Sequence, residues 1–336
     1  SGTVINKAGL IETVGSGEPR IDYKDDSKGA LLLEPQRSNS LLQSNQFDTT
    51  WAISSGSITG GEYGYDGSNN AWLLDSSAFL FQNINVSGTF CVSIYAKKGT
   101  ANELRLRVRQ TSDANAFFDL ENGVVLSSYG DIDASIEPIS VDGWYRCQIN
   151  FVASGTNNVR IYSNDGDSIY IQNAQLEQGS YATSIIPTQG SAVTRVADVC
   201  NNSNVSVLDL GNSYTLFLDI PYLTNTYNNV FCDIKLSNNV ESFSIRNFNT
   251  SLRVYNNLDA SYPTSLISSS TKKWVIRIDG TSFKLFGAES SLSGSLSTER
   301  SIGKVNFKGQ QIPIELKDFK IYNTALSDAE CQALVN

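Results

Sequence analysis

The 336-residue sequence contains no histidine and no methionine. Without histidine, the Ser-His-Asp and Cys-His arrangements of nucleophilic catalysis are excluded in their usual forms, and so is every His-ligated metal site. Without methionine, position 1 is not a natural translation start, so we expect the chain to be a processed product or an excised fragment. Proline is also sparse, with 7 residues against 25 glycines.

Positive charge is scarce as well. Lys and Arg total 25 against 34 Asp and Glu, which gives a net charge of −9 and a pI of about 4.7. This balance argues against nucleic-acid binding through phosphate neutralisation, so we expect no nucleic-acid partner. No apolar run approaches the ~18 residues that a membrane span needs, so we expect no membrane insertion. The 5 cysteines are scattered and contain no CxxC pair, which predicts neither a disulfide framework nor a zinc site.

What is present predicts an all-β protein. Hydrophobic residues make up 40% of the chain, enough for real cores, and 15 Tyr and 15 Phe favour strands. Charged residues make up only 18%, below the usual ~25%, and Ser, Asn and Thr take their place. Such a composition is typical of short strands joined by Ser/Asn/Gly turns.

The pattern along the chain predicts two β-sandwich domains and a short C-terminal helix. Residues 1–36 are polar and turn-rich, and we expect them to be a lead-in segment. Residues 37–190 and 191–336 each show recurring apolar alternation with turn signals, as a sandwich requires. Near the end, Ser327 and Glu330 form a capping box, which predicts a helix over about 325–334.

Alternation also predicts a polar sheet face in the first domain. In the strand expected over 103–110, leucine and valine alternate strictly with arginine, so the arginines point away from the core. The same alternation in three other expected strands, over 89–97, 144–152 and 158–163, predicts further polar side chains that point away from the core. If these strands share a sheet, one face collects Tyr95, Arg105, Arg107, Arg109, Gln148, Asn150, Arg160 and Tyr162.

These eight residues are our candidate ligand-binding set. Arg, Gln and Asn groups make paired hydrogen bonds to vicinal hydroxyls or to carboxylates, and Tyr rings stack on the apolar face of a pyranose. The set therefore suits a sugar. A subunit contact and a plain solvated sheet face are the alternatives.

The other aromatic residues divide into core and loop candidates. Trp144 and Trp274 each lead a strand, and Trp51 follows Phe47 in the segment after residue 39, so we expect all three in cores. Trp72 is open between core and surface. Tyr63 and Tyr65 lie in a Gly-rich stretch and are candidates for an exposed binding loop.

We expect no enzyme activity and assign no catalytic residue. A glycosidase needs only two carboxylates, so the lack of histidine does not exclude one. The nearest approach to a Glu-x-Asp-x-x-Glu strand motif spans 131–137, where Glu137 is one residue out of phase and would face the other side of a strand. A polysaccharide-degrading glycosidase or lyase remains the alternative. No cofactor is required, while a structural Ca²⁺ is left open at 164–167 or at Asp22, Asp25 and Asp26.

Three stretches resemble known families. PRIDY at 19–23 with LLLEPQRSN at 31–39 resembles the opening segment of many bacteriophage tail and fibre proteins. WYR at 144–146, IQNAQLEQG at 171–179 and ATSIIPT at 182–188 resemble the end of a carbohydrate-binding-module-type jelly roll, and TRVAD at 194–198 its connection to the next domain. DFKIYNTALSDAE at 318–330 is similar to the closing strand and helix of laminin-G-like, concanavalin-A-like sandwiches.

The resemblance implies a tail-fibre or receptor-binding protein of a phage virion, with a jelly roll followed by a laminin-G-like domain. It implies non-catalytic attachment to a host-surface polysaccharide or glycan, with other virion proteins as partners and a homotrimeric state. A purely structural decoration protein of the virion, without a ligand, is the third alternative.

Overall fold

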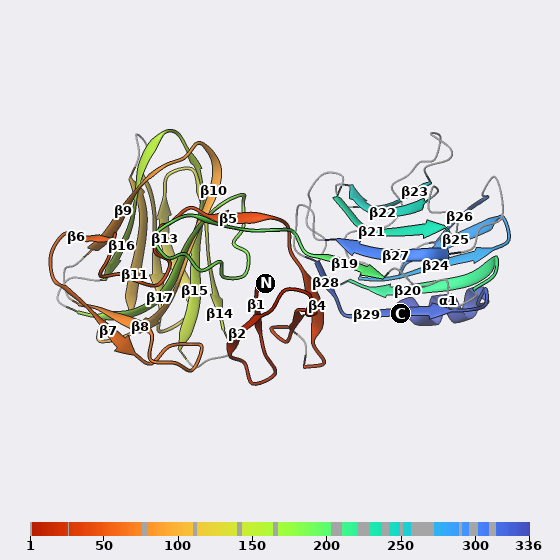
Figure 1. Ribbon diagram of the computed structural model, residues 1–336, viewed down its shortest axis with the longest axis horizontal. Coiled ribbons are helices and arrows are strands. Elements are labelled where there is room, and N and C mark those ends of the chain that lie inside the picture. Colours follow the sequence, from red (N-terminus) through yellow and green to blue (C-terminus); the bar gives the residue numbers. More distant parts are fainter. Residues whose placement is uncertain are drawn as a thin grey trace. The chain divides into compact units, whose positions relative to one another are not determined.

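In the residues that it describes, the computed structural model is all-β apart from one short helix, as the sequence predicts (Figure 1). It divides into two compact units, the first formed by Ser1–Ser27 with Arg37–Arg195 and the second by Lys28–Gln36 with Val196–Asn336. The domain limits of 37–190 and 191–336 stay predictions. The residues that the structure describes are 2–25, 27–75, 79–109, 113–139, 143–163, 167–202, 210–220, 229–236, 242–248, 251–256, 272–288, 291–295, 302–308 and 314–336.

The first unit is a sandwich of two antiparallel sheets. In its described residues, one sheet, called here the β10 sheet, has the strand order β14 (Ile132–Pro138), β15 (Trp144–Ala153), β10 (Gly88–Lys98), β17 (Ile169–Gln178), β8 (Ala71–Asp75) and β7 (Ser57–Glu62). The other, called the β11 sheet, has the order β13 (Val124–Tyr129), β12 (Ala114–Asp119), β11 (Glu103–Arg109), β16 (Thr156–Ser163), β9 (Phe79–Asn85) and β6 (Ala52–Ile53).

Strict alternation builds the core between these sheets. On β11, Leu104, Leu106 and Val108 are at most 1% exposed, and the arginines between them face away. On β15, Cys147 and Ile149 point into the same core. Burying each large apolar side chain contributes roughly 1.5–3 kcal/mol, so a one-residue slip of either strand would be costly. The inward set predicted for β11 is confirmed.

A second apolar cluster covers part of the outer face of the β10 sheet. It consists of Tyr65, Ala71, Tyr95, Trp144 and Ile185, with Ile11 packed at its margin. Its members come from the sheet, from the loop after β7 and from the segment after β17. Ile11 belongs to the N-terminal segment, which forms the hairpin β1 (Gly2–Ile5) and β2 (Ile11–Val14) and the short β3 (Ile21–Asp22). This face of the sheet is therefore partly interior.

Asn39 bonds to the segment over 183–188, in which the chain runs back along the β10 sheet after β17; we call it the returning segment. Asn39 ends β5 (Arg37–Asn39), which pairs with β18 (Val193–Arg195). Its side chain, fully buried, donates to the carbonyls of Ala174 and Ile186 and accepts from the backbone N–H groups of Leu41 and Leu176. A single amide thus satisfies four buried backbone groups from three segments.

Gln175 and Glu177 hold the same returning segment from β17. The Gln175 amide nitrogen donates to the carbonyls of Thr183 and Ser184, and its oxygen accepts from the N–H of Ile186 at 2.7 Å. The buried Glu177 carboxylate accepts from Gln175 and from the N–H of Thr183 at 2.9 Å. We call Asn39, Gln175 and Glu177 the polar clamp.

The second unit is also built of antiparallel sheets. One sheet has the order β19 (Val199–Asn202), β27 (Ile302–Lys308), β21 (Asn229–Leu236), β22 (Ser242–Phe248) and β23 (Ser251–Asn256). Another has the order β26 (Ser291–Ser295), β25 (Ser282–Phe286), β24 (Lys273–Asp279), β20 (Ser213–Asp219) and β29 (Asp318–Tyr322), and β4 (Ala30–Leu33) pairs with β28 (Ile314–Leu316). Trp274, 1% exposed, lies in the core of this unit, as predicted.

The helix α1 (Asp328–Val335) covers the outer face of the β24–β20 sheet (Figure 1). Cys331 and Val335 of α1 pack against Phe217, Val275 and Phe286 of the sheet. Ser327 caps the helix and Glu330 completes the capping box, so the sequence prediction for this helix is confirmed.

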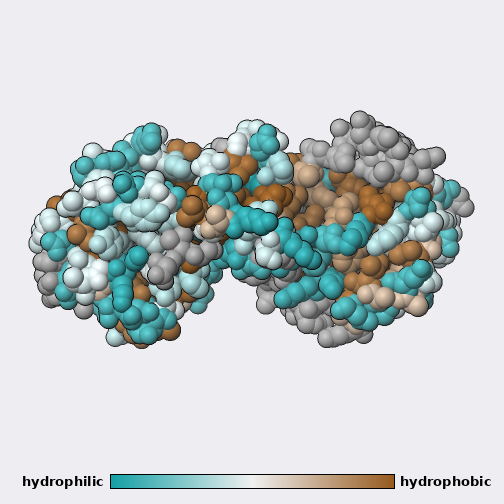
Figure 2. All heavy atoms as spheres, turned by 90° about the horizontal axis from the view of Figure 1, so that it is seen from below, coloured by the Kyte–Doolittle hydropathy of each residue, from teal (hydrophilic) through white to brown (hydrophobic). Residues whose placement is uncertain are grey.

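The surface of the first unit matches its composition. In Figure 2 hydrophilic and intermediate residues dominate the visible face of this unit, and hydrophobic residues form small separate spots. Cys91, Cys147, Cys200 and Cys331 are free thiols. Among the helical residues described, none forms a segment long and apolar enough to cross a membrane.

The polar clamp generates the first prediction. Asn39→Ala leaves buried backbone donors and acceptors unpaired, at about 1–3 kcal/mol each. We expect the free energy of unfolding of the first unit to fall by at least about 2 kcal/mol. Urea denaturation followed by tryptophan fluorescence measures it, with Ser38→Ala, which removes a solvent-exposed hydroxyl contact to Thr194, as the matched control. Equal stability of the two variants would contradict the clamp.

Candidate functional site

The structure brings five of the eight predicted site residues together. Arg105, Arg107 and Arg109 on β11 lie beside Arg160 and Tyr162 on β16, on the outer face of the β11 sheet. In register, Arg105 is opposite Tyr162 and Arg107 is opposite Arg160. This part of the predicted face exists.

The other three residues lie on the other sheet, so the single predicted face is divided. Tyr95 belongs to β10, and Gln148 and Asn150 to β15, both in the β10 sheet. Tyr95 is only 5% exposed, because it packs within the second apolar cluster. Gln148 donates to Ser135 of β14 at 2.7 Å. Alternation tells which side of a strand a residue faces, but not which of two sheets holds the strand.

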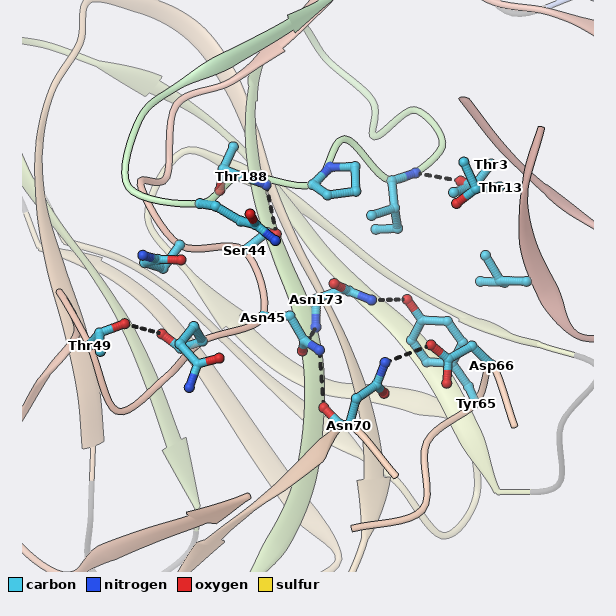
Figure 3. Close-up of a pocket in the computed structure, with 16 residues that line it drawn as sticks. Thr3, Thr13, Ser44, Asn45, Thr49, Tyr65, Asp66, Asn70, Asn173 and Thr188 are labelled. Carbon is cyan, nitrogen blue, oxygen red and sulfur yellow. Dashed lines mark hydrogen bonds between the residues drawn. The ribbon is translucent and has the colours of Figure 1, made fainter. Parts of the chain in front are cut away.

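A cavity of about 600 Å³ opens beside the β10 sheet in the first unit (Figure 3). Its walls come from the N-terminal hairpin, the loops after β5 and β7, strand β17 and the returning segment. They are mainly neutral and polar. The lining residues are Thr3, Ile11, Thr13, Gln43, Ser44, Asn45, Gln46, Thr49, Tyr65, Asp66, Asn70, Asn173, Ile185, Pro187, Thr188 and Gln189.

Strand β17 is distorted where it meets this cavity. The β10–β17 register shifts between Ser93 and Tyr95, so β17 carries one extra residue. At the shift, Asn173 has a φ of 49°, in the left-handed region that costs most residues free energy and that asparagine tolerates best. Bulges of this kind turn a side chain away from the regular alternation and are common beside functional sites. Here the bulge brings the Asn173 amide to the cavity wall.

A second strained position adjoins the cavity. Among the described residues, Thr50, with a φ of 64°, is the other non-glycine residue with a positive φ. A β-branched residue in this region is rare, because its side chain clashes with the backbone. Its neighbour Thr49 lines the cavity. Strain of this kind concentrates at functional sites, and both instances occur here.

Asn45 is the centre of the hydrogen-bond network that shapes the floor (Figure 3). Its side chain accepts from the backbone N–H of Asn173 at 2.9 Å and donates to the carbonyl of Asn70 at 3.0 Å. Asn173 in turn donates to the Tyr65 hydroxyl, and Asn70 donates to Asp66 at 2.9 Å. The network joins three segments and fixes the amide groups in place.

Two tryptophans support the loop that carries Asn45. The Trp51 indole donates to the carbonyl of Gln43, and the Trp72 indole donates to the carbonyl of Asn45, both at 2.8 Å. The two side chains are 6% and 8% exposed. Trp51 is a core residue, as predicted. Trp72, for which the sequence leaves core and surface open, is also a core residue.

The ionisable groups of the cavity are held in one state. Burial raises the pKa of Asp66, but hydrogen bonds from Asn70 and Ser68 outweigh it, so the net pKa lies below the ordinary value. Burial raises the pKa of Tyr65 well above its ordinary value. At neutral pH the cavity therefore holds one carboxylate and a neutral phenol.

One buried hydroxyl at the cavity is left without a partner. Thr188 is 2% exposed and its backbone N–H donates to Ser44 at 3.0 Å, but its Oγ1 has no hydrogen-bond partner within the described residues. Gln43 and Gln189, which face each other in an isolated antiparallel bridge, add their amide groups nearby. Several described residues have such unpartnered buried atoms, and Thr188 is the one of them that lines the cavity, which makes it a candidate contact for an occupant.

Sequence reasoning found little of this cavity. The sequence indicates Tyr63 and Tyr65 as candidates for an exposed binding loop. Tyr65 lines the cavity but is only 1% exposed, so it is a buried part of the wall. Tyr63 is 65% exposed and does not line the cavity. Asn45 and Asn173 are 128 residues apart in the chain, and no pattern in the sequence joins them. The density of Asn and Gln at 171–175 was the only signal available.

The described residues include no group of three or more Cys, Asp or Glu that could hold a metal ion. Of the calcium candidates, residues 164–166 and Asp26 lie outside the described residues. The Asp22 carboxylate accepts from the backbone N–H of Lys24 at 2.8 Å. A structural calcium ion stays a prediction.

Comparison with known proteins gives structural likeness only. No protein-family model matches the chain, and no curated protein sequence matches it significantly. Among solved structures, the chain is similar to the N-terminal CBM22-1–CBM22-2 tandem domain of Paenibacillus barcinonensis Xyn10C, with 10% identity and a TM-score of 0.28 over 86% of this chain and 97% of that one. It is also similar to domains LG4-5 of the mouse laminin alpha1 chain, with 10% identity and a TM-score of 0.25 over 86% and 94%.

A leech intramolecular trans-sialidase matches with 15% identity and a TM-score of 0.31 over 39% of this chain. The chain spans about a quarter of that protein, 24% of its length. At such identities and TM-scores the likenesses assign no activity and no site residue.

The Asp66 network generates the second prediction. Because the folded-state pKa of Asp66 is depressed, its contribution to stability is fully present above the ordinary pKa of 3.8 and is lost as the pH falls through the lower folded value. We expect the difference in unfolding free energy between the wild type and Asp66→Asn to shrink below pH 3.8 and to stay constant from pH 5 to 8. Urea denaturation across pH 3–8 measures it, with the exposed Asp75→Asn as control. A difference that changes between pH 5 and 8 would contradict the assignment.

Proposed function

We propose that the chain is a non-catalytic carbohydrate-binding protein whose site is the amide-lined cavity. The observation that carries the proposal is the set of mainly neutral amide and hydroxyl groups that line the cavity beside the β17 bulge, with the unpaired Thr188 hydroxyl among them. Sugar hydroxyls both donate and accept hydrogen bonds, and so do amides and hydroxyls, so the two surfaces are complementary. A neutral lining also avoids the cost of burying unpaired charge.

The size and shape of the cavity agree with this proposal. A volume of about 600 Å³ lies within the ~300–1,000 Å³ that small-molecule sites occupy. The lining also includes Ile11, Ile185 and Pro187, which offer apolar surface for the C–H face of a pyranose. The network around Asn45 keeps the polar groups in position before a ligand arrives, which lowers the entropic cost of binding.

The carboxylate content of the cavity favours binding over hydrolysis. Glycosidases of the usual kind use two carboxylates about 5–9.5 Å apart. Among the cavity residues, all of them described, Asp66 is the one carboxylate, and its depressed pKa makes it a poor proton donor. Glu137, from the nearest sequence motif, is taken up by an ion pair with Lys24 at 2.8 Å. These observations support binding without catalysis over the glycosidase or lyase alternative.

We extend the proposal to attachment of a phage virion to a host-surface polysaccharide. The support is the resemblance of the segments at 19–23 and 31–39 to the opening segment of phage tail and fibre proteins, and of those at 171–179 and 182–188 to the end of the carbohydrate-binding-module-type jelly roll that follows it. Several of those residues, including Asn173 and Thr188, belong to the cavity, and Asn39 and Gln175 hold its wall. The same resemblance supports other virion proteins as partners and a homotrimer, which light scattering of the purified chain tests.

The Thr188 hydroxyl gives the third prediction. Thr188→Val removes the unpaired hydroxyl and keeps the shape of the side chain. We expect affinity for the bound polysaccharide to fall about five- to tenfold, because one hydrogen bond is lost and each ~1.4 kcal/mol corresponds to a tenfold change in affinity. We expect no loss of stability. Affinity electrophoresis through gels that contain neutral surface polysaccharides, followed by calorimetry, measures it.

Thr156→Val, an exposed threonine of β16 outside the cavity, is the matched control and should retain wild-type affinity. No retardation of the wild type by any neutral polysaccharide would overturn the proposed function. Retardation that Thr188→Val leaves unchanged would overturn the assignment of the site.

The fourth prediction concerns activity. Because the cavity lacks a second carboxylate, we expect incubation of the chain with the neutral polysaccharide that it binds to release no new reducing ends, and incubation with a uronate-containing polysaccharide to release no unsaturated products. A reducing-sugar assay measures the first reaction, and absorbance at the wavelength of unsaturated uronates measures the second. Release of either product that Asp66→Asn abolishes would establish the enzyme instead.

A further inference from the structure

The outer face of the β11 sheet interleaves arginine side chains with aromatic rings. We call this surface the guanidinium–aromatic face and define it by six residues from four neighbouring strands, β9, β16, β11 and β12. They are Phe79, Arg105, Arg107, Phe117, Arg160 and Tyr162. None of them lines the amide-lined cavity.

The rings hold the guanidinium groups in place. The Cζ atom of Arg105 lies 5.0 Å from the ring centroid of Phe117 and 4.9 Å from that of Tyr162. The Cζ atom of Arg160 lies 4.8 Å from the centroid of Phe79, and the Phe79 and Tyr162 rings stack at 4.7 Å. Cation–π contacts of this kind fix planar groups that would otherwise move on flexible stems. The N–H edges are therefore presented in a defined orientation.

Much of the donor capacity of these groups is unused. Nε and Nη2 of Arg105 donate to Oδ1 of Asn115 at 3.2 and 2.8 Å. Arg160 donates from Nε to Asn158 and from Nη1 to the Tyr162 hydroxyl. A guanidinium carries five N–H donors, so within the described residues Arg105 and Arg160 each retain three donors without a partner. The acceptors that bond to these two arginines are neutral.

The face also holds clustered positive charge. Arg107 and Arg160 are directly opposite each other across two strands, and like charges in that position are destabilising. Asp113 forms an ion pair with Arg107, and the Glu103 carboxylate, on the same side of β11, interacts electrostatically with Arg105. Within the described part of the chain, no carboxylate forms an ion pair with Arg105 or Arg160. This is a local cationic surface on a chain with a net charge of −9.

We propose that the guanidinium–aromatic face is a second ligand site and binds an anionic polysaccharide through its carboxylate groups. Guanidinium edges pair with carboxylates in a two-pronged geometry, and a carboxylate between Arg107 and Arg160 would relieve their repulsion. Tyr129, 61% exposed and in contact with Phe117 at a centroid distance of 6.1 Å, adds a ring on which a pyranose can stack. This site goes beyond the proposed function, because the cavity takes neutral sugar groups.

The probe that tests the proposal is polygalacturonate, with its fully methyl-esterified form as the uncharged counterpart. Calorimetry with the full chain at low salt measures both. We expect binding of polygalacturonate, loss of binding to the ester, and an affinity about tenfold lower for Arg160→Gln, since one charge-assisted contact is removed. Lys7→Gln removes the same charge at an exposed turn outside the face and should stay within twofold of the wild type.

Circular dichroism checks that Arg160→Gln is folded, and Arg105→Gln replaces it if it is not. Thr188→Val should bind polygalacturonate as the wild type does, which separates this site from the cavity. Absence of binding, equal binding of the ester, or equal losses in Arg160→Gln and Lys7→Gln would each overturn the proposal. Equal affinity for polyglutamate would overturn its saccharide specificity.

Discussion

The structure of the first unit depends on hydrogen bonds between buried side-chain amides and the backbone of a segment that belongs to no sheet. After β17 the chain returns along its own sheet through 183–188, where its N–H and C=O groups have no ladder partners. Asn39 and Gln175, both fully buried, supply partners at Thr183, Ser184 and Ile186, and the side chains of Thr3, Ser44 and Glu177 supply others. Because unpaired backbone groups in an interior cost so much, these side chains stabilise the returning segment in its place. The cavity exists because this segment forms one of its walls.

The same principle explains why the cavity lining is mainly neutral, with Asp66 as its one carboxylate. Its groups are amides that are already engaged with the backbone on one side, as Asn45 is with Asn173 and Asn70. Amides can bridge segments without the desolvation penalty of a charge, and they keep donor or acceptor capacity for a ligand. The bulge at Asn173 then places such a group where regular pleating would not. Support of the fold and display of polar groups are thus achieved by one kind of side chain.

Much of the fold could be predicted from the sequence, because it depends on local periodicity. The alternation in β11 gives the inward leucines and the outward arginines, and Ser327 with Glu330 gives the helix. The division of the predicted site between two sheets could not be predicted. Tyr95 and Arg105 are ten residues apart and both face away from the core, yet their strands belong to opposite sheets. Face follows from period two, whereas sheet membership follows from long-range pairing, which leaves no local trace.

The N-terminal hairpin has a consequence for how this protein can be divided. Thr3, Ile11 and Thr13 line the cavity, and the Thr3 hydroxyl accepts from the N–H of Ile185, which lies beside it in the cavity wall, at 2.9 Å. Residues 28–36 lie between this hairpin and the rest of the first unit in the chain but belong to the second unit. The smallest piece with a complete cavity is therefore discontinuous in sequence. A sandwich transplanted from Arg37 onward would carry its cores with it but only part of the cavity wall, so exchange of this specificity between chains requires two segments to move together.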